Sequence, residues 1–299
     1  MATSDFLREL LDDRLPPAAS DWLGGACETV AAGTSDTDFC AKLSTASRHV
    51  RADPLAPSEG ERARAGELVE GWDPERWTLR ETARVALVLA RPDLDAPSAE
   101  RALEEAFRYA DVGELCALYR SLAHLPRPER FLWRAKEGCR TNMLTVFEAD
   151  VCDTPYPYRF FDDIAWNQAV VKALFVGAPA WRIFGLDRRL SPELARMALD
   201  LADERRSAGR VVQHELWLCL GEHGGERGLA ALERELESSH RRGVRAALYG
   251  LARAGATERV KRFCDATRDP DLRASAQEAL AGRTDQRVFR SLDPALQAG

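Results

Sequence analysis

The chain has 299 residues, 45% of them hydrophobic and 30% charged, which is the composition of a soluble globular protein with a substantial core. Its formal net charge of −6 excludes a global basic field that would attract nucleic acid or anionic lipid. No apolar run approaches the roughly 20 residues that cross a bilayer, which argues against direct membrane insertion. The acidic, amphipathic N-terminal stretch is unlike a secretory signal, so we expect a cytoplasmic protein.

Sequence motifs exclude the commonest enzyme classes. The seven cysteines are scattered without a CxxC pair, and the five histidines show no HExxH spacing, which argues against a disulfide framework and a zinc site. The chain also lacks GxSxG, P-loop and Rossmann patterns, and no motif in it indicates a particular cofactor.

The first third predicts short amphipathic helices separated by Pro, Gly and Ser. Apolar residues recur at helical spacing in six segments, and residues 51–58 form a loop. Nowhere do β-branched residues alternate with polar ones as a strand requires, so the fold class we predict is all-α. The six segments are residues 4–15, 20–32, 35–49, 77–89, 98–110 and 112–125.

The stretch from Arg140 to Asn167 is unusually rich in polar and aromatic residues. We expect a helix from Pro128 to Val151, with small residues on one stripe that would let another helix approach closely. Asn142 falls on that stripe, so we expect its amide to face a packed interface, where it would need a partner.

The segment Thr154–Pro157 (TPYP) predicts an elbow, because a proline biases the residue before it towards extended backbone. A second helix is expected from about Phe160 to Val176. Asp163 and Asn167 are four residues apart at the head of its apolar stripe, so we expect both to point inward. This pair suits the floor of a pocket, and equally a buried clasp between two helices.

The remaining chain predicts further helix pairs. Ser191, Pro192 and Glu193 supply a cap, a first-position proline and a first-turn carboxylate for a helix ending near Gly209. Later helical segments resemble stacked HEAT-type pairs, whose short apolar faces must pack on neighbours. They cover residues 227–238, 241–253, 257–267 and 270–281. The architecture we predict is antiparallel helix pairs in a curved, HEAT-like solenoid array.

A set of ordered motifs over about residues 110–220 resembles the EboA family of metabolite traffic proteins. The motifs are RTNM (140–143), VFEA (146–149), PYP (155–157), two aspartates before AWNQ (165–168), VKALF (171–175), GLDRR (185–189), LARM (194–197) and ELW (215–217). Two positions depart from the family pattern. Thr154 stands where the family has asparagine, and Asp203 stands where it has histidine, which puts in doubt any mechanism needing that histidine.

The resemblance implies a part in making or moving a small metabolite towards the cell envelope, with a prenylated compound as one candidate, and it brings no catalytic residues. It suggests an N-terminal helical region (1–125), an EboA-like motif core (126–220) and HEAT-like helical repeats (221–299) within one continuous domain.

Three functions fit these observations. The first is an accessory protein that binds a small-molecule metabolite or pathway enzymes in secondary-metabolite biosynthesis and export. The second is an enzyme acting on that prenylated or polyol metabolite through acidic residues, with or without a divalent metal. The third is a pure helical-repeat interaction scaffold.

We predict that seven residues converge on one ligand-binding cavity, because the elbow would turn the two polar stripes towards each other. They are Arg140, Asn142, Glu148, Tyr156, Asp163, Trp166 and Asn167.

Each group in this stretch also has a simpler interpretation. Its carboxylates could bind a hard cation such as Mg²⁺. Asp162 and Asp163 are not followed by the further aspartate that completes a DDxxD motif, however, so helix caps and salt bridges are favoured over a metal site. The aromatic residues could line a ligand wall, but packing of the helix junction is favoured. Arg140 could grip an anion or pair with Glu137 or Glu148, and neither is favoured. The carboxylates are Glu148, Asp150, Asp153, Asp162 and Asp163.

Overall fold

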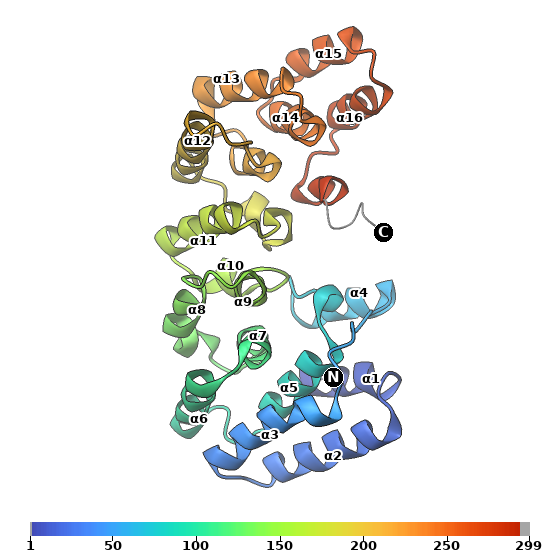
Figure 1. The fold of residues 1–299 in the computed structure, drawn as a ribbon, viewed down its shortest axis with the longest axis vertical. Helices are drawn as coiled ribbons and strands as arrows, with labels where there is room; N and C mark the ends of the chain where they lie inside the picture. The colour runs from blue at the N-terminus through green and yellow to red at the C-terminus, as the bar shows by residue number, and fades with distance from the viewer. Residues whose placement is uncertain (1, 294–299) are drawn as a thin grey trace. The chain divides into compact units, whose positions relative to one another are not determined.

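The computed structural model describes residues 2–293 as an all-α protein. These residues form no strand, and their single β-bridge joins Pro54 to Thr78. None of their helices is long and apolar enough to cross a membrane. The chain divides into two compact units, Met1–Phe161 and Asp162–Gly299, coloured blue to green and yellow-green to red in Figure 1. The prediction of an all-α fold is confirmed.

Unit 1 is built from short helices, four of which begin at a side-chain cap. Ser35, Ser58, Thr78 and Asp111 each accept a hydrogen bond from a backbone N–H of the following turn. The helices are α1 (Thr3–Asp12), α2 (Pro17–Ala31), α3 (Asp36–His49), α4 (Glu59–Leu68), α5 (Leu79–Leu89), α6 (Pro97–Tyr109), α7 (Val112–Ser121), α8 (Leu132–Gly138), α9 (Leu144–Val151) and α10 (Tyr156–Phe160), with 3₁₀ turns at Pro74–Arg76, Leu122–His124 and Pro128–Phe131.

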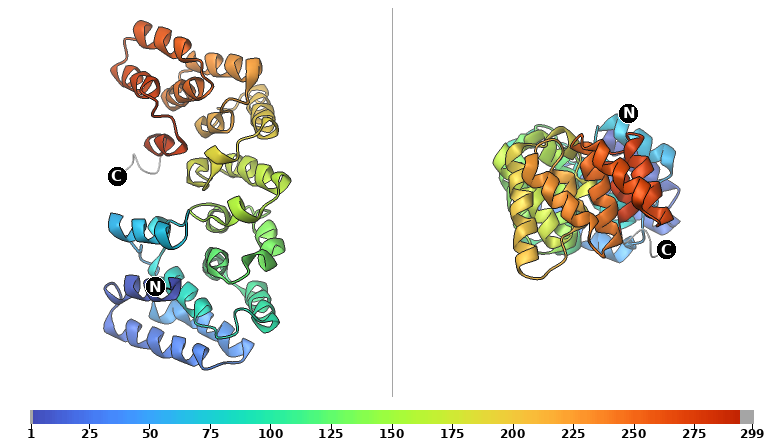
Figure 2. Two further views of the ribbon diagram at one scale, coloured as in Figure 1. Left: turned by 180° about the vertical axis from the view of Figure 1, so that it is seen from behind. Right: turned by 90° about the horizontal axis from the view of Figure 1, so that it is seen from above.

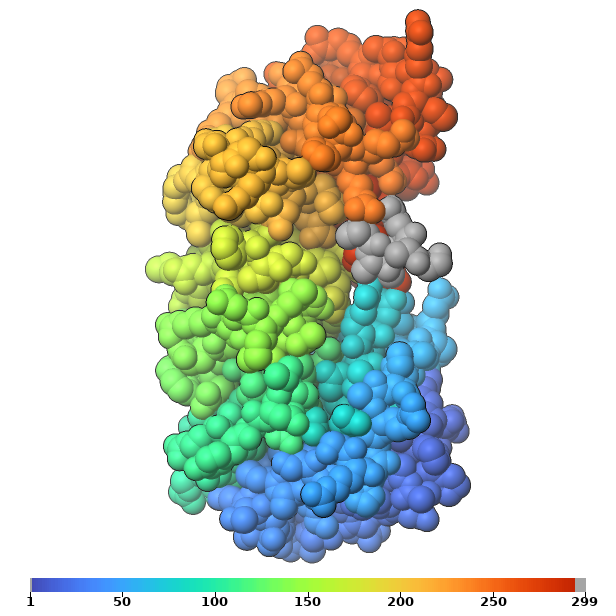
Figure 3. Space-filling view, in the orientation of Figure 1, coloured from blue at the N-terminus to red at the C-terminus, as the bar shows by residue number. Residues whose placement is uncertain are grey.

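Helix α5 is the centre of unit 1, packing on α1, α2, α3 and α7. Figure 2 shows α2 and α3 side by side, and in Figure 3 their blue side chains form one continuous surface. Eight residues of α5 are buried, including Arg84, whose guanidinium donates to the Leu43 carbonyl and faces Glu114. Burial of apolar surface from several neighbouring helices therefore stabilises α5.

The prediction of one helix from Pro128 to Val151 is wrong. The helix breaks after Gly138 and resumes at Leu144. In the break, the Thr141 hydroxyl accepts a hydrogen bond from the Met143 backbone N–H, a local contact that competes with helix formation. Asn142 therefore leaves the expected stripe and is exposed, so the prediction that it faces a packed interface is also wrong.

The elbow at residues 154–157 leads directly into a helix, which the sequence did not predict. Tyr156 begins the short helix α10 instead of being extended, because a proline is tolerated in the first turn of a helix, where Pro157 lies. The next helix begins at Asp163 and not near Phe160, since the Asp162 side chain caps it by accepting from the Ala165 N–H.

Between Asp162 and Asp293, unit 2 contains six helices, and the predicted start at Ser191 is confirmed. The Ser191 hydroxyl accepts a hydrogen bond from the Leu194 N–H, and Pro192 opens the helix. The helices are α11 (Asp163–Val176), α12 (Pro192–Ser207), α13 (Gly225–Leu236), α14 (Arg241–Arg253), α15 (Thr257–Ala266) and α16 (Pro270–Leu280), with 3₁₀ turns at Ala180–Arg182, Leu186–Arg188, His214–Cys219 and Gln286–Leu292.

Helix α14 is the centre of unit 2 and contacts α13, α15, α16 and the 3₁₀ turn that carries Trp217. Trp217 is fully buried, and a Cβ at Gly250 would lie 3.5 Å from its Cβ and 2.7 Å from Leu232. Glycine thus allows α13 and the Trp217 turn to approach α14 closely. Helix-on-helix stacking is compatible with the HEAT-like array, which stays a prediction.

Candidate functional site

The candidate site lies in unit 2, where α11 meets the segment that leads into α12. Trp166 and Asn167 lie one turn into α11 and are 1% and 5% exposed. The Trp166 indole N–H donates to the Arg189 carbonyl at 3.2 Å, and the Arg189 guanidinium lies 4.7 Å from the centre of the indole ring. The two residues therefore fix each other through a hydrogen bond and a cation–π contact.

Arg189 also pairs with Asp163 at the start of α11. Its Nη2 donates to the Asp163 Oδ1 at 2.8 Å, while the side chains are 18% and 94% exposed respectively. The prediction that Asp163 points inward is therefore wrong, because it is the first helical residue after the Asp162 cap and lies at the solvent edge.

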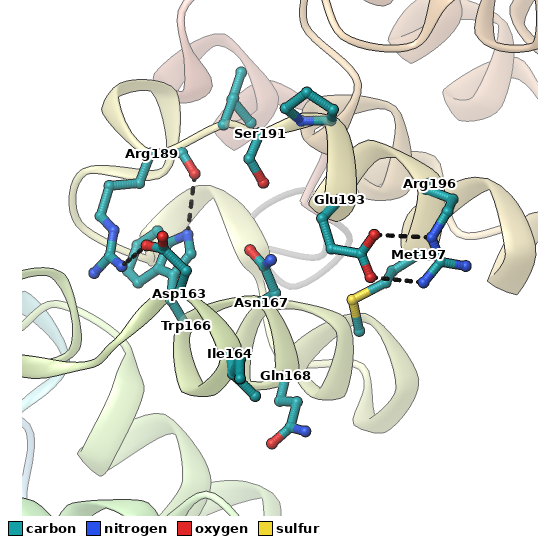
Figure 4. A pocket seen from close by; sticks show the side chains of 12 residues that line it. Asp163, Ile164, Trp166, Asn167, Gln168, Arg189, Ser191, Glu193, Arg196 and Met197 are labelled. Atoms are coloured by element: carbon teal, nitrogen blue, oxygen red, sulfur yellow. Dashed lines mark hydrogen bonds and ion pairs between the residues drawn. The ribbon is translucent and has the colours of Figure 1, made fainter.

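The first turns of α12 form the other wall. Glu193 holds Arg196 through two hydrogen bonds of 2.9 and 2.6 Å, and Arg196 also reaches Asp200 at 2.6 Å. The walls enclose a pocket of about 660 Å³, within the range of small-molecule sites (Figure 4). Its lining comprises Asp163, Ile164, Trp166, Asn167, Gln168, Arg189, Leu190, Ser191, Pro192, Glu193, Arg196 and Met197.

Asn167 is the polar side chain aimed into this pocket (Figure 4). Although 95% of the residue is buried, its amide has no hydrogen-bond partner among residues 2–293. Its polar atoms are not among the enclosed side-chain atoms that lack a partner, so the amide is accessible from the pocket, where both its N–H and its C=O can bond a molecule.

Three of the seven predicted site residues, Asp163, Trp166 and Asn167, line this pocket. The other four lie in unit 1, and their joining a common cavity with these three stays a prediction.

Those four occupy different surroundings within unit 1. Arg140 is exposed and pairs with Glu137, the salt-bridge alternative considered from the sequence. Asn142 is exposed, and Glu148 is half-buried on α9. Tyr156 is 1% exposed, and its hydroxyl donates to the Pro128 carbonyl at 2.7 Å. Its ring packs 4.9 Å from that of Phe160, which supports the packing interpretation of the aromatic residues.

The acidic residues of the 140–167 stretch have separate structural roles. Asp162 caps α11, and the backbone carbonyl of Asp153 accepts from the Asp73 N–H. Asp150 is buried and accepts a hydrogen bond from the Cys139 thiol at 3.3 Å, and burial raises the pKa of its carboxyl well above the usual range. Residues 2–293 contain no group of three His, Cys, Asp or Glu side chains that could hold a metal.

Sequence reasoning missed the second half of the pocket. Arg189, Glu193, Arg196 and Met197 lie in the GLDRR and LARM motifs and in the first turns of α12. The signal was present, because these motifs carry the family resemblance, but no helical periodicity connects them with Asn167 twenty or more residues earlier. Asp203, where the family has histidine, instead bonds Arg227 at 2.6 Å on the surface.

Comparisons with known proteins agree with the motifs. The family model described as "Metabolite traffic protein EboA" matches residues 3–221, more than two thirds of the chain and the whole of the pocket. No curated protein and no solved structure matches the chain. The extent of the family match shows that the chain belongs to the EboA family of metabolite traffic proteins.

Proposed function

We propose that this protein is an accessory factor of metabolite traffic that binds a small molecule in the pocket between α11 and α12. The family supplies the general role, and the pocket supplies a place for the metabolite. Binding and release without chemical change would suffice for such a role.

The observation that carries the proposal is the Asn167 amide. The residue is 95% buried, its amide bonds no other group among residues 2–293, and what remains accessible of it faces the pocket, so its N–H and C=O are available to orient a bound molecule. Of the two lining residues next to it in sequence, Trp166 already bonds Arg189, and Gln168 is exposed on the rim, where water competes for its amide. Asn167 therefore supplies the specific polar contact.

The rest of the lining suits a molecule with both polar and apolar parts. Ile164, Leu190 and Met197 offer apolar surface, whereas Arg189 and Arg196 offer charge. Sites of this kind bury the apolar body of a ligand and use a few placed polar groups to orient it.

The direct test is equilibrium dialysis of the purified protein against a small-molecule extract of the source cells, followed by mass spectrometry of the retained compounds. Asn167→Leu keeps the number and branching of the side-chain heavy atoms but removes the amide, and we expect it to lose the compounds that the wild type retains. Gln277→Leu is the matched control, because it removes an exposed amide on α16 far from the pocket lining.

The proposal fails if Asn167→Leu retains the same compounds as the wild type and Gln277→Leu. It also fails if the folded wild type retains none.

A further inference from the structure

We infer, on the basis of the proposed function, that the ligand of the α11–α12 pocket is an anionic amphiphile. Its carboxylate or phosphate group would replace the Asp163 carboxylate on the Arg189 guanidinium. A hydroxyl near that group would bond the Asn167 amide, and an apolar chain would lie along Ile164 and Met197. In the absence of ligand, the Asp163 carboxylate would thus occupy the position on Arg189 that the anionic group of the ligand takes.

The asymmetry of the Asp163–Arg189 pair supports this exchange. The Arg189 side chain is 18% exposed, and its position is fixed by the Trp166 ring at 4.7 Å. The side chain of Asp163, the other partner of this ion pair, is 94% exposed. Because an ion pair with an exposed partner contributes only about 0–1 kcal/mol, the carboxylate can leave Arg189 at little cost. The guanidinium stays in place and presents a fork that matches a planar carboxylate or a phosphate.

The helix ends at the pocket favour an anion for a second reason. Helices α11 and α12 both begin at the pocket, and the first turn of a helix carries partial positive charge on its N–H groups. Glu193, the carboxylate in the first turn of α12, is bonded twice to Arg196 and therefore does not compete for Arg189. An anion bound to Arg189 would thus lie near the first turns of two helices, whose own carboxylates, Asp162 and Glu193, are engaged by the Ala165 N–H and by Arg196.

The unpartnered Asn167 amide narrows the ligand class further. A hydroxyl is both donor and acceptor, so one hydroxyl can accept from the amide N–H and donate to its carbonyl oxygen in different orientations. The apolar lining at Ile164 and Met197 can cover a hydrocarbon chain. The ligand class is therefore a hydroxylated carboxylate or phosphate with an aliphatic tail.

The test uses four eight-carbon probes on the full chain: octanoate, 2-hydroxyoctanoate, octyl phosphate and octanol. Binding is followed by the indole N–H signal of Trp166 in ¹H–¹⁵N NMR spectra, identified by its disappearance in Trp166→Phe. This signal reports directly on Arg189, whose carbonyl accepts that N–H. We expect saturable shifts with the three anions and none with octanol. Octanoate against octyl phosphate decides between carboxylate and phosphate, and a stronger effect of 2-hydroxyoctanoate supports the Asn167 contact.

Three variants connect the signal to the residues. Arg189→Gln should weaken binding of the anions at least tenfold, and Asp163→Asn should strengthen it severalfold by removing the carboxylate that occupies Arg189. Arg188→Gln, which makes the same charge change at the exposed neighbouring residue, should leave binding unchanged. Arg189→Lys, which keeps the charge, should retain part of the affinity.

Failure of this inference differs from failure of the proposed function. The anionic ligand class is overturned if octanol binds as tightly as octanoate, if no anion shifts the Trp166 signal, or if Arg189→Gln binds the anions like the wild type. Retention of extract compounds through Asn167 would still support the pocket in each of those cases. If the double variant Asn167→Leu/Arg189→Gln binds octanoate like the wild type, both the anionic ligand class and the proposed binding in this pocket are contradicted.

Discussion

Glu215 is a buried carboxyl of unit 2 that connects stability to pH. It lies in the ELW motif, and its Oε2 accepts a hydrogen bond from the Ala180 N–H at 2.7 Å. Burial raises the pKa of its carboxyl to about 8, because the charged form loses its hydration. The backbone N–H bond opposes this increase but does not overcome it.

We predict that Glu215 makes the protein less stable as the pH rises from about 4.5 to 8. In this window the folded state holds the proton and the unfolded state has released it, so stability falls with pH by up to roughly 1 kcal/mol per pH unit. Glu215→Gln keeps a neutral acceptor for the Ala180 N–H and should lose this slope. Urea denaturation at pH 5, 6, 7 and 8 checks this, and parallel pH profiles for the two proteins would contradict it.

At the residue scale, the sequence predicted part of the pocket correctly. Asn167 was found because a polar residue at the head of an apolar helical stripe faces inward, and Trp166 was proposed as one of the aromatic residues of this stretch. The same logic failed for Asn142, since it assumed an unbroken helix that the Thr141 contact interrupts. It also failed for Asp163, because the helix begins there and not near Phe160, which leaves this side chain at the exposed end of the helix.

At the element scale, the break between α8 and α9 allows a close approach that the small-residue stripe predicted. A Cβ at Gly138 would lie 2.6 Å from both the Asp150 Oδ2 and the Tyr119 Cε1. No side chain fits at this distance unless the Asp150 carboxyl group and the Tyr119 ring shift. Glycine at 138 is therefore required by packing within unit 1.

Gly138→Ala should destabilise the protein by about 1–3 kcal/mol, because an extra methyl group in a packed interior forces its neighbours apart. Gly24→Ala is the control within the same unit, since Gly24 is exposed in the middle of α2 and a Cβ there would meet nothing within 4 Å. That substitution should stabilise the protein by about 0.5–1 kcal/mol. Urea denaturation of both variants measures the change in the free energy of unfolding, which should be negative for Gly138→Ala and positive for Gly24→Ala. A neutral or stabilising Gly138→Ala would show that α8 does not need this close contact.

At the scale of the whole molecule, the family match ends inside the compact unit that contains the pocket. The match covers residues 3–221, whereas unit 2 continues through α13 to α16. Arg253 of α14 donates to Asp187 of the GLDRR motif at 2.6 Å, and the other Asp187 oxygen accepts from the Gln286 N–H at 2.7 Å. The Gln286 side chain in turn bonds the carbonyls of Trp181 and Ile183. The later helices therefore hold the segment that leads to Arg189.

Arg253→Gln should lower the free energy of unfolding by about 2–3 kcal/mol. The Arg253 side chain is 8% exposed, and its loss leaves the partly exposed Asp187 without its cation. Arg262→Gln, an exposed substitution on α15, should change stability by less than about 0.5 kcal/mol. Equal effects of the two substitutions on urea denaturation would contradict a structural role for the Asp187–Arg253 pair.

The all-α class and most helix positions followed from the sequence because periodicity and caps act locally. The segments expected at residues 35–49, 77–89 and 241–253 appear as α3, α5 and α14 with ends displaced by at most two residues. The pocket depends instead on contacts between residues 163–168 and 189–197, and a single sequence does not reveal which distant segments meet. The contacts of Asp187 with α14 and Gln286 were missed for the same reason.

The most direct test of the pocket's role is complementation in source cells that lack this protein. Small-molecule profiles would be compared after expression of the wild type, Asn167→Leu or Gln277→Leu at equal protein levels. We predict that the wild type and Gln277→Leu restore the distribution of the affected metabolite between cells and medium, whereas Asn167→Leu leaves it as in the deletion. Full restoration by Asn167→Leu would contradict the central claim that this pocket binds the metabolite.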